Sequence, residues 1–393
     1  MPKEGSVEKD SVENNDISVE GSELLAWLML MRDCRWNRRQ KRELISAFES
    51  VEAIYQAPAN NLHNVVSGRK KTKLAAFNIG SLMSQASKDL SWVDSNNVSL
   101  VPYTYSGYSK LLAQVDDPPL ALFAMGDISL LNEPQVGIVG SRRPTPIGAK
   151  VTRQISQELS GLGIVIVSGM ALGVDGLAHQ GALDRDSATV AVMGCGLDVV
   201  YPSRHKRLFE EIQFSGLLIS EYPPGTRPSK YTFPERNRIV SGLSMGVVII
   251  EAAEKSGTLI TARLAMEQNR EVMVLPGSAL SSQYRGSHRL IKNGAALVTA
   301  SDDVLFILKN QLEKLNLNKE IGSISCVNND LGERNVCADE RALMTLIGAE
   351  PVSVESLILS SGLTAAEVSS MLLVLELKDQ VAISDDGGYV NIG

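Results

Sequence analysis

The chain has 393 residues, a formal net charge of −7 and 44% hydrophobic residues. That length exceeds what one compact core holds, so two to four domains are expected. No apolar run reaches the roughly 18–20 residues that span a bilayer, and no secretory signal precedes the first elements. The four cysteines are scattered without metal-ligand spacing. The sequence therefore predicts a reduced, cytoplasmic protein with no membrane partner and no metal.

Charge is distributed unevenly along the chain. Residues 1–25 hold seven acidic and two basic residues, and residues 338–393 hold nine acidic and two basic ones. The body between them carries a net charge of +5. This asymmetry predicts an anionic partner for the body and a different partner for the ends, unless the acidic ends only aid solubility. Residues 1–22 combine high charge with low hydrophobicity, which predicts a disordered acidic tail.

Residues 23–95 are predicted to form a small helical domain. One helix begins near Leu24, and another is expected over 43–53. A basic run at 35–42 separates them and includes Trp36, and a second cluster contains Lys70, Lys71 and Lys73. Either cluster would contact phosphates, or else form a solvated helix face, and the sequence leaves both alternatives open.

Residues 96–308 alternate short apolar segments with helical ones. The predicted strands are 135–139, 164–168, 189–193, 217–220, 246–251, 271–275 and 296–299. The predicted helices are 147–161, 174–184, 204–214, 235–243, 257–268 and 286–293. Strands that are apolar on both faces are typical of a parallel sheet covered by helices. The pattern predicts an α/β fold with a doubly wound, Rossmann-like parallel sheet.

The C-terminal part divides into a linker and a compact unit. Residues 309–337 are polar and rich in Asn, which predicts a linker. Residues 338–393 contain three expected helices, at 339–347, 353–360 and 364–378, followed by a hairpin. Helix-turn-helix plus hairpin predicts a winged helix.

The most informative motif follows the first strand of the α/β region. Gly140 and Ser141 make a small-residue turn, and Arg142 and Arg143 follow before a helix begins. Ligands of parallel sheets bind outside the carboxyl ends of the strands, and the start of a helix offers free N–H groups to an anion. We expect a phosphate site here. Gly169 and Gly173 follow the next strand and shape the same edge, or else make only a tight turn.

A second cluster lies just before a predicted helix. Lys230, Phe233, Arg236, Asn237 and Arg238 combine three cations, an aromatic ring and an amide within nine residues. Aromatic rings stack on unpaired bases while cations hold phosphates, so the cluster favours a single-stranded nucleic acid. Some members have a structural alternative: Arg236 would brace the sheet edge through a buried pair, and Phe233 would belong to the core.

A third turn contains Ser256, Gly257 and Thr258, which would donate to a phosphate or only cap a helix. The chain has no G-x-x-x-x-G-K-[ST] and no complete G-x-G-x-x-G, so neither a P-loop ATPase nor a dinucleotide cofactor is expected. No catalytic triad or pair of carboxylates is evident. The sequence therefore predicts a binding protein without a cofactor, rather than an enzyme.

Taken together, these motifs resemble the DNA-processing protein A family, also called DprA or Smf. In chain order they are Gly140–Arg142, Ser168–Asp175, Ala191–Pro202, Phe233–Ile239, Glu251–Ala262 and Pro276–Ser278. The resemblance implies a bacterial cytoplasmic protein of natural transformation that binds and protects incoming single-stranded DNA. It further implies that the protein loads the RecA recombinase and forms a homodimer through the α/β domain.

The resemblance assigns DNA contacts to five positions: Ser141, Arg142, Lys230, Phe233 and Asn237. Arg143, Arg236 and Arg238 are added from charge and spacing alone. Relatives have a glycine-centred hairpin in the N-terminal domain, whereas 33–37 contains no glycine. The C-terminal unit is acidic, which makes it an expected protein-contact module rather than a duplex reader.

The runner-up function is a nucleotide-binding enzyme. The α/β region also resembles phosphoribohydrolases of nucleoside monophosphates, whose motif is P-G-G-x-G-T-x-x-E. The corresponding stretch, 253–261, lacks the paired glycines and carries Thr261 in place of the catalytic carboxylate. The sequence therefore favours binding over hydrolysis.

Overall fold

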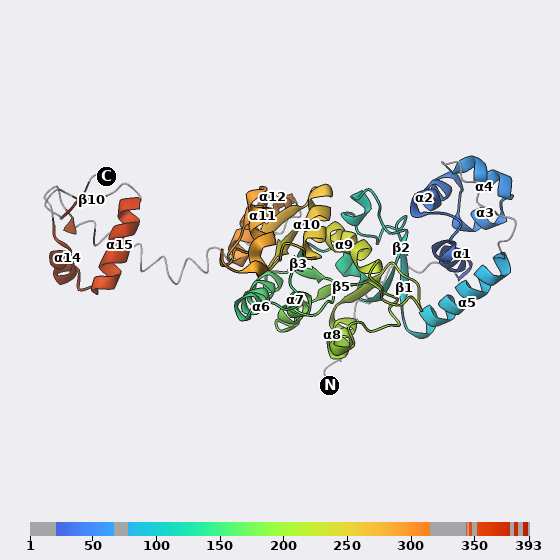
Figure 1. Cartoon of the computed structure of the whole chain (residues 1–393), viewed down its shortest axis with the longest axis horizontal. Coiled ribbons are helices and arrows are strands. Elements are labelled where there is room, and N and C mark those ends of the chain that lie inside the picture. Colours follow the sequence, from blue (N-terminus) through green and yellow to red (C-terminus); the bar gives the residue numbers. More distant parts are fainter. Residues whose placement is uncertain are drawn as a thin grey trace, which may run out of the picture. The chain divides into compact units, whose positions relative to one another are not determined.

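The computed structural model describes residues 21–66, 78–314, 343, 346, 347, 352–377, 381–383 and 388–391. The chain divides into two compact units, Met1–Leu315 and Asn316–Gly393 (Figure 1). The predicted acidic tail up to residue 20, the lysines near residue 70 and the linker from residue 315 lie outside the described residues. No helix in the described ranges is long and apolar enough to cross a membrane.

The first unit is built on a nine-stranded sheet in the order β1-β2-β6-β5-β4-β3-β7-β8-β9. Strands β3 to β9 pair in parallel, as predicted, whereas β1 and β2 are antiparallel and extend one edge. The bounds are β1 Ser99–Pro102, β2 Ala121–Gly126, β3 Gln135–Val139, β4 Val165–Ser168, β5 Thr189–Met193, β6 Leu217–Ser220, β7 Gly246–Ile249, β8 Glu271–Val274 and β9 Ala296–Leu297. The predicted α/β fold with a mostly parallel sheet is confirmed, and the two antiparallel strands were missed.

Helices cover both faces of this sheet. They are α6 Pro146–Gly161, α7 Val174–Leu183, α8 Lys206–Ser215, α9 Thr232–Leu243, α10 Thr258–Glu267, α11 Arg285–Lys292 and α12 Ser301–Lys314. Figure 1 shows α6, α7 and α8 on one side of the sheet and α9, α10 and α11 on the other. The chain changes sides between β6 and β7, which places the topological switch point beside β3. Helix α12 continues past residue 308, so residues 309–314 of the predicted linker are helical.

Among the residues that the structure describes before the sheet, the helices are α1 Gly21–Arg32, α2 Arg38–Ala47, α3 Val51–Gln56, α4 Ala59–Val65 and α5 Ile79–Ser95. The single helix predicted over 43–53 is wrong. Helix α2 ends at Ala47, and the Ser50 hydroxyl accepts from the Ala53 N–H to start α3. The start of α2 is fixed by a capping box between Asn37 and Gln40.

The N-terminal helices and one face of the sheet share a single apolar core. Trp27 and Leu30 of α1 belong to the same buried cluster as Phe123 of β2 and Leu218 of β6. Burying such side chains stabilises the folded state by about 1.5–3 kcal/mol each. The helices therefore pack on the α/β region and are not merely tethered to it.

The second unit contains α14 Val354–Ser361, α15 Ala365–Leu377 and an antiparallel hairpin of β10 Val381–Ile383 and β11 Tyr389–Asn391. Gly362 ends α14 in the left-handed conformation, with a φ of 71°. Leu357, Val368 and Leu372 form its core. These elements agree with the predicted winged helix. The helix expected at 339–347 falls mostly outside the described residues.

Candidate nucleic-acid interface

A pocket of about 550 Å³ opens at the switch point of the sheet. Loops after β3, β4 and β7 and the first turns of α9 supply its walls. The sequence-predicted residues that line it are Gly140, Arg142, Lys230, Phe233, Arg236, Asn237, Ser256, Gly257 and Thr258. Motifs more than 100 residues apart in sequence thus meet in one place, because parallel strands end at the same edge of a sheet.

The loop after β3 is held by neighbouring backbone. The Val174 N–H donates to the Ser141 carbonyl over 3.1 Å, and the Thr258 hydroxyl donates to the Gly140 carbonyl over 3.1 Å. Gly173 has a φ of 81°, and a Cβ there would overlap the Ser141 carbonyl oxygen. This fixed loop presents Arg142 to the pocket, while Arg143 is exposed outside the pocket lining.

Two aromatic rings form one wall. The rings of Tyr201 and Phe233 lie 5.3 Å apart between centroids, tilted by 34°. A Cβ at Gly194 would come within 2.7 Å of the Phe233 ring, so glycine makes room for it. Tyr201 is 43% exposed. It lies in the loop after β5, and the peptide bond that joins it to Pro202 is cis. The sequence predicts only a rigid loop at Tyr201-Pro202, although an aromatic residue after the glycine-containing loop at the end of a strand is a signal for a stacking surface.

The start of α9 supplies cationic and polar groups. Lys230 is exposed, and its Nζ lies 5.1 Å from the centroid of the Tyr231 ring. Asn237 lines the pocket from the second turn of the helix. Among the described residues, neither Arg142 nor Lys230 makes an ion pair with a carboxylate within 4 Å. Both cations remain available to an anionic ligand.

Ser256 and Thr258 bond to each other before α10. The Ser256 hydroxyl donates to Thr258 Oγ1 over 2.9 Å and accepts from the Thr258 N–H over 3.2 Å. Gly257 between them is exposed, and a Cβ there would meet nothing within 4 Å. The turn lines the pocket, and the N-cap residue of α10, Gly257, has no side chain that could cap the helix, so donation to a phosphate stays a prediction.

Two buried groups of opposite charge, Arg236 and Asp175, lie at the floor of the pocket. Arg236 is 4% exposed and donates to the carbonyls of Gly169 and Val192, while Asp175 is 7% exposed and accepts from the Ala171 N–H. Burial raises the pKa of Asp175 and lowers the pKa of Arg236, and each charge partly offsets the shift of the other. Arg236 therefore braces the floor through the Gly169 and Val192 carbonyls, and among the described residues it has no carboxylate within ion-pair distance.

Two other predicted contacts need correction. Gly169 is buried beneath the floor, where a Cβ would overlap the Arg236 guanidinium, so its role is to admit that side chain. Arg238 is 7% exposed and does not line the pocket. Its Nη2 donates to both carboxylate oxygens of Glu221, and its remaining nitrogens are buried, so the guanidinium is not accessible to DNA in this structure.

The basic run at 35–42 lies on and before α2 and does not line the pocket. Arg35 bonds Asp33, and Lys41 is buried, with its Nζ donating to the Met31 carbonyl. Burial lowers the pKa of Lys41 to about 8. Arg38 and Arg42 pair with carboxylates of the α/β region. The phosphate-contact alternative for this run has no support in the structure.

The fold and site together define a Rossmann-like α/β protein with a cation-rimmed, aromatic-lined pocket at its switch point, followed by a winged helix. Residues 99–309 match the family described as DNA recombination-mediator protein A, and residues 333–387 match the DprA winged helix domain. The chain belongs to the DNA recombination-mediator protein A family, the family of the DprA and Smf proteins.

Individual relatives agree with this assignment. Protein Smf of Escherichia coli is 38% identical over 77% of this chain and 80% of its own length. The DNA processing protein DprA of Bacillus subtilis is 34% identical over 69% of this chain and 92% of its own length. The X-ray structure of DprA from Streptococcus pneumoniae, 35% identical, superposes with a TM-score of 0.61 and covers 72% of this chain and 96% of the other.

Proposed function

We propose that the protein binds single-stranded DNA in the pocket at the switch point. The observation that carries the proposal is the arrangement of two cations that form no ion pair with any described carboxylate, Arg142 and Lys230, beside the aromatic wall of Tyr201 and Phe233. Cations hold the phosphate backbone, and the rings offer stacking surfaces to the bases. Asn237 adds a polar group to the pocket lining, and Ser141 lies just outside the lining between Gly140 and Arg142.

A single strand suits this arrangement better than a duplex. The aromatic wall lies inside a concave pocket, and bases reach such a wall only when they leave their own stack. The residues proposed to contact DNA are Gly140, Ser141, Arg142, Lys230, Phe233, Asn237, Ser256, Gly257 and Thr258, with Arg143 on the approach and Gly173 shaping the loop.

The wider role we propose is to protect incoming single-stranded DNA and load RecA onto it during natural transformation, as a homodimer in the bacterial cytoplasm. Its support is membership of a family of DNA-processing proteins. Sedimentation equilibrium would test the homodimer, and strand exchange by RecA on DNA coated with single-strand-binding protein would test loading. A strictly monomeric protein, or no gain in strand exchange, would contradict these two roles.

The hydrolase alternative finds little support at the pocket. Thr261 lines it where a catalytic carboxylate would be needed, and Asp175 is the single carboxylate among its described lining residues. That carboxylate is buried and accepts from the Ala171 N–H, which leaves it poorly placed to activate water. Release of ribose phosphate from a nucleoside monophosphate would revive the alternative.

The decisive experiment is fluorescence anisotropy of matched single- and double-stranded oligonucleotides, titrated with the intact protein over a salt series. We expect tight binding to the single strand with a steep salt dependence, and much weaker binding to the duplex. Equal or weak affinity for both would contradict the proposed function, and nucleotides would then be screened as ligands.

A further inference from the structure

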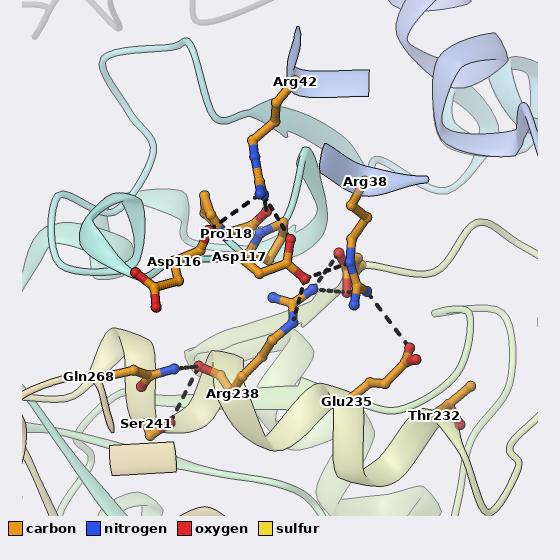
Figure 2. Close-up of polar contacts among 12 residues, drawn as sticks. Arg38, Arg42, Asp116, Asp117, Pro118, Thr232, Glu235, Arg238, Ser241 and Gln268 are labelled. Carbon is orange, nitrogen blue, oxygen red and sulfur yellow. Dashed lines mark hydrogen bonds and ion pairs between the residues drawn. The ribbon is translucent and has the colours of Figure 1, made fainter. Parts of the chain in front are cut away.

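Six charged residues connect α2 to α9, the helix that begins at the pocket. We call them the α2–α9 ionic cluster: Arg38, Arg42, Asp117, Glu221, Glu235 and Arg238. Figure 2 shows Arg38 and Arg42 reaching from α2 toward Asp117, with Arg238 approaching from α9. Each residue of the cluster has at least one partner of opposite charge.

Asp117 joins the two arginines of α2. Its carboxylate lies 2.8 Å from Arg38 Nε and 2.8 Å from Arg42 Nη1, and Arg238 Nε is 3.9 Å away. Burial would raise the pKa of Asp117, but the hydrogen bond from Arg42 and the charges of Arg38 and Arg238 outweigh burial and lower it. The carboxylate is therefore charged and fully engaged near neutral pH.

Arg38 also reaches the segment that leads into α9. Its Nη1 lies 3.4 Å from Glu221 and 3.7 Å from Glu235, which is in the first turn of α9. Tyr222 strengthens this link, because its hydroxyl contacts Glu235 over 3.1 Å and the Thr232 carbonyl over 3.2 Å. One guanidinium thus touches both ends of the segment 221–235.

That segment contains Lys230 and Phe233, and Asn237 follows in the next turn. Arg38 does not line the pocket, and its side chain is 34% exposed with three carboxylates around it. Burial alone would lower the pKa of Arg38, but Glu221, Asp117 and Glu235 together raise it. These carboxylates would repel a phosphate at the position where Arg38 would have to bind one.

We propose that Arg38 is a positioning residue for DNA binding: through Asp117, Glu221 and Glu235 it holds the start of α9, and with it Lys230, Phe233 and Asn237. This inference rests on the proposed function. It assigns the N-terminal helices a share in DNA affinity without any contact between them and DNA. It also explains why a strongly basic helix is turned toward acidic residues of the same chain.

The first test compares Arg38→Ala with Arg39→Ala. Both remove one positive charge from α2, but the Arg39 side chain is 77% exposed and its ion pair among the described residues is with Glu43 of its own helix. We expect Arg38→Ala to weaken single-strand binding by about 3- to 10-fold, with the wild-type salt slope, and Arg39→Ala to change neither. Arg38→Lys keeps the charge but loses the forked guanidinium whose Nε reaches Asp117 while its Nη1 reaches Glu221 and Glu235, so its affinity should fall between those of the two alanine variants.

In a second test, the proposal and simple electrostatics predict opposite changes in DNA affinity. Removing a carboxylate near a DNA site should strengthen binding, because repulsion falls. Asp117→Asn should instead weaken it by about 3- to 10-fold, because Arg38 and Arg42 lose their shared partner. Asp116→Asn is the matched control, since Figure 2 shows the Asp116 carboxylate pointing away from both arginines.

Amide hydrogen exchange measured without DNA tests the positioning role of Arg38 independently of whether the protein binds DNA. Exchange over residues 229–237 should be faster in Arg38→Ala and Asp117→Asn than in the two controls, even if the wild-type protein binds no DNA. A salt slope reduced by about 0.7 in Arg38→Ala would make Arg38 a phosphate ligand and overturn the proposal. Wild-type affinity and wild-type exchange in Arg38→Ala and Asp117→Asn would overturn it equally. Should Arg38→Ala fail to fold, Asp117→Asn and Arg38→Lys decide the outcome.

Discussion

Arg142 and Arg143 on the loop after β3, and Arg38 and Arg42 on α2, are equally basic pairs in very different surroundings. In the described structure the first pair has no carboxylate within ion-pair distance, while the second pair shares Asp117 at 2.8 Å from each member. The first pair is therefore available to bind an external anion, whereas the second pair forms ion pairs with Asp117 of the same chain. Local density of positive charge alone does not mark a nucleic-acid surface.

The largest expected effect lies beneath the pocket. Arg236→Ala should lower the free energy of unfolding by about 3–5 kcal/mol, because the buried Gly169 and Val192 carbonyls lose their donor and the buried Asp175 carboxylate loses a nearby positive charge. Urea denaturation followed by circular dichroism would measure the loss, with Arg142→Ala as the control of equal charge. If Arg236→Ala instead leaves stability intact and lowers the salt slope of DNA binding, Arg236 belongs with Arg142 as a ligand.

Gly173→Ala should disturb both folding and binding. A side chain at a φ of 81° costs about 1–3 kcal/mol, and the new Cβ would overlap the loop that carries Arg142. Gly163→Ala is the control, because its φ is 78° but no atom lies within 4 Å of the added Cβ. Denaturation should show a loss in both variants, and anisotropy a loss in Gly173→Ala alone. If the two variants bind DNA equally well, the loop that carries Arg142 does not contribute to DNA affinity.

Removing the free cations should weaken DNA binding without harming the fold. Arg142→Ala and Lys230→Ala are each expected to cost about 1–3 kcal/mol of single-strand binding and to reduce the log–log salt slope by about 0.7. Anisotropy over a salt series measures both quantities. Unchanged affinity in both variants would move the DNA site away from the pocket.

The smallest effect is expected from the second unit. Deleting residues 338–393 removes nine acidic and two basic residues and should leave single-strand affinity within about threefold of the intact chain, because phosphate contacts need cations. The same anisotropy assay measures this. A collapse of affinity on truncation would show that the acidic winged helix takes part in DNA binding.

Much of the fold could be predicted because its signal is local. The strands from β3 to β9 are continuous apolar runs, and glycines mark where loops must approach other backbone. Strands β1 and β2 were not predicted. Strand β2, Ala121–Gly126, nevertheless begins with five buried residues, a pattern that is typical of a strand in the core. The helix over 43–53 was wrong because Ser50 caps a new helix there, and a serine within an otherwise helical pattern gives only a weak break signal.

The sequence predicted the motifs that form the site, but not how their side chains are arranged in space. Arg142, Lys230 and Phe233 meet because strand order brings their loops to one edge. Tyr201 was overlooked because its value depends on lying 5.3 Å from Phe233, a distance that no spacing in the sequence encodes. Arg236 and Arg238 were assigned from charge, yet helix geometry turns both inward from α9.

The sequence alone determined the α/β alternation, the glycine turns at the strand ends and the acidic character of the C-terminal unit, because each depends on residues that are neighbours in the chain. Only the tertiary structure decided which cations stay free. Asp117 neutralises Arg42 from 75 positions away, and Glu221 neutralises Arg238 from 17 positions away. The availability of a charge depends on its partners and burial in space, and these are set by how the elements pack.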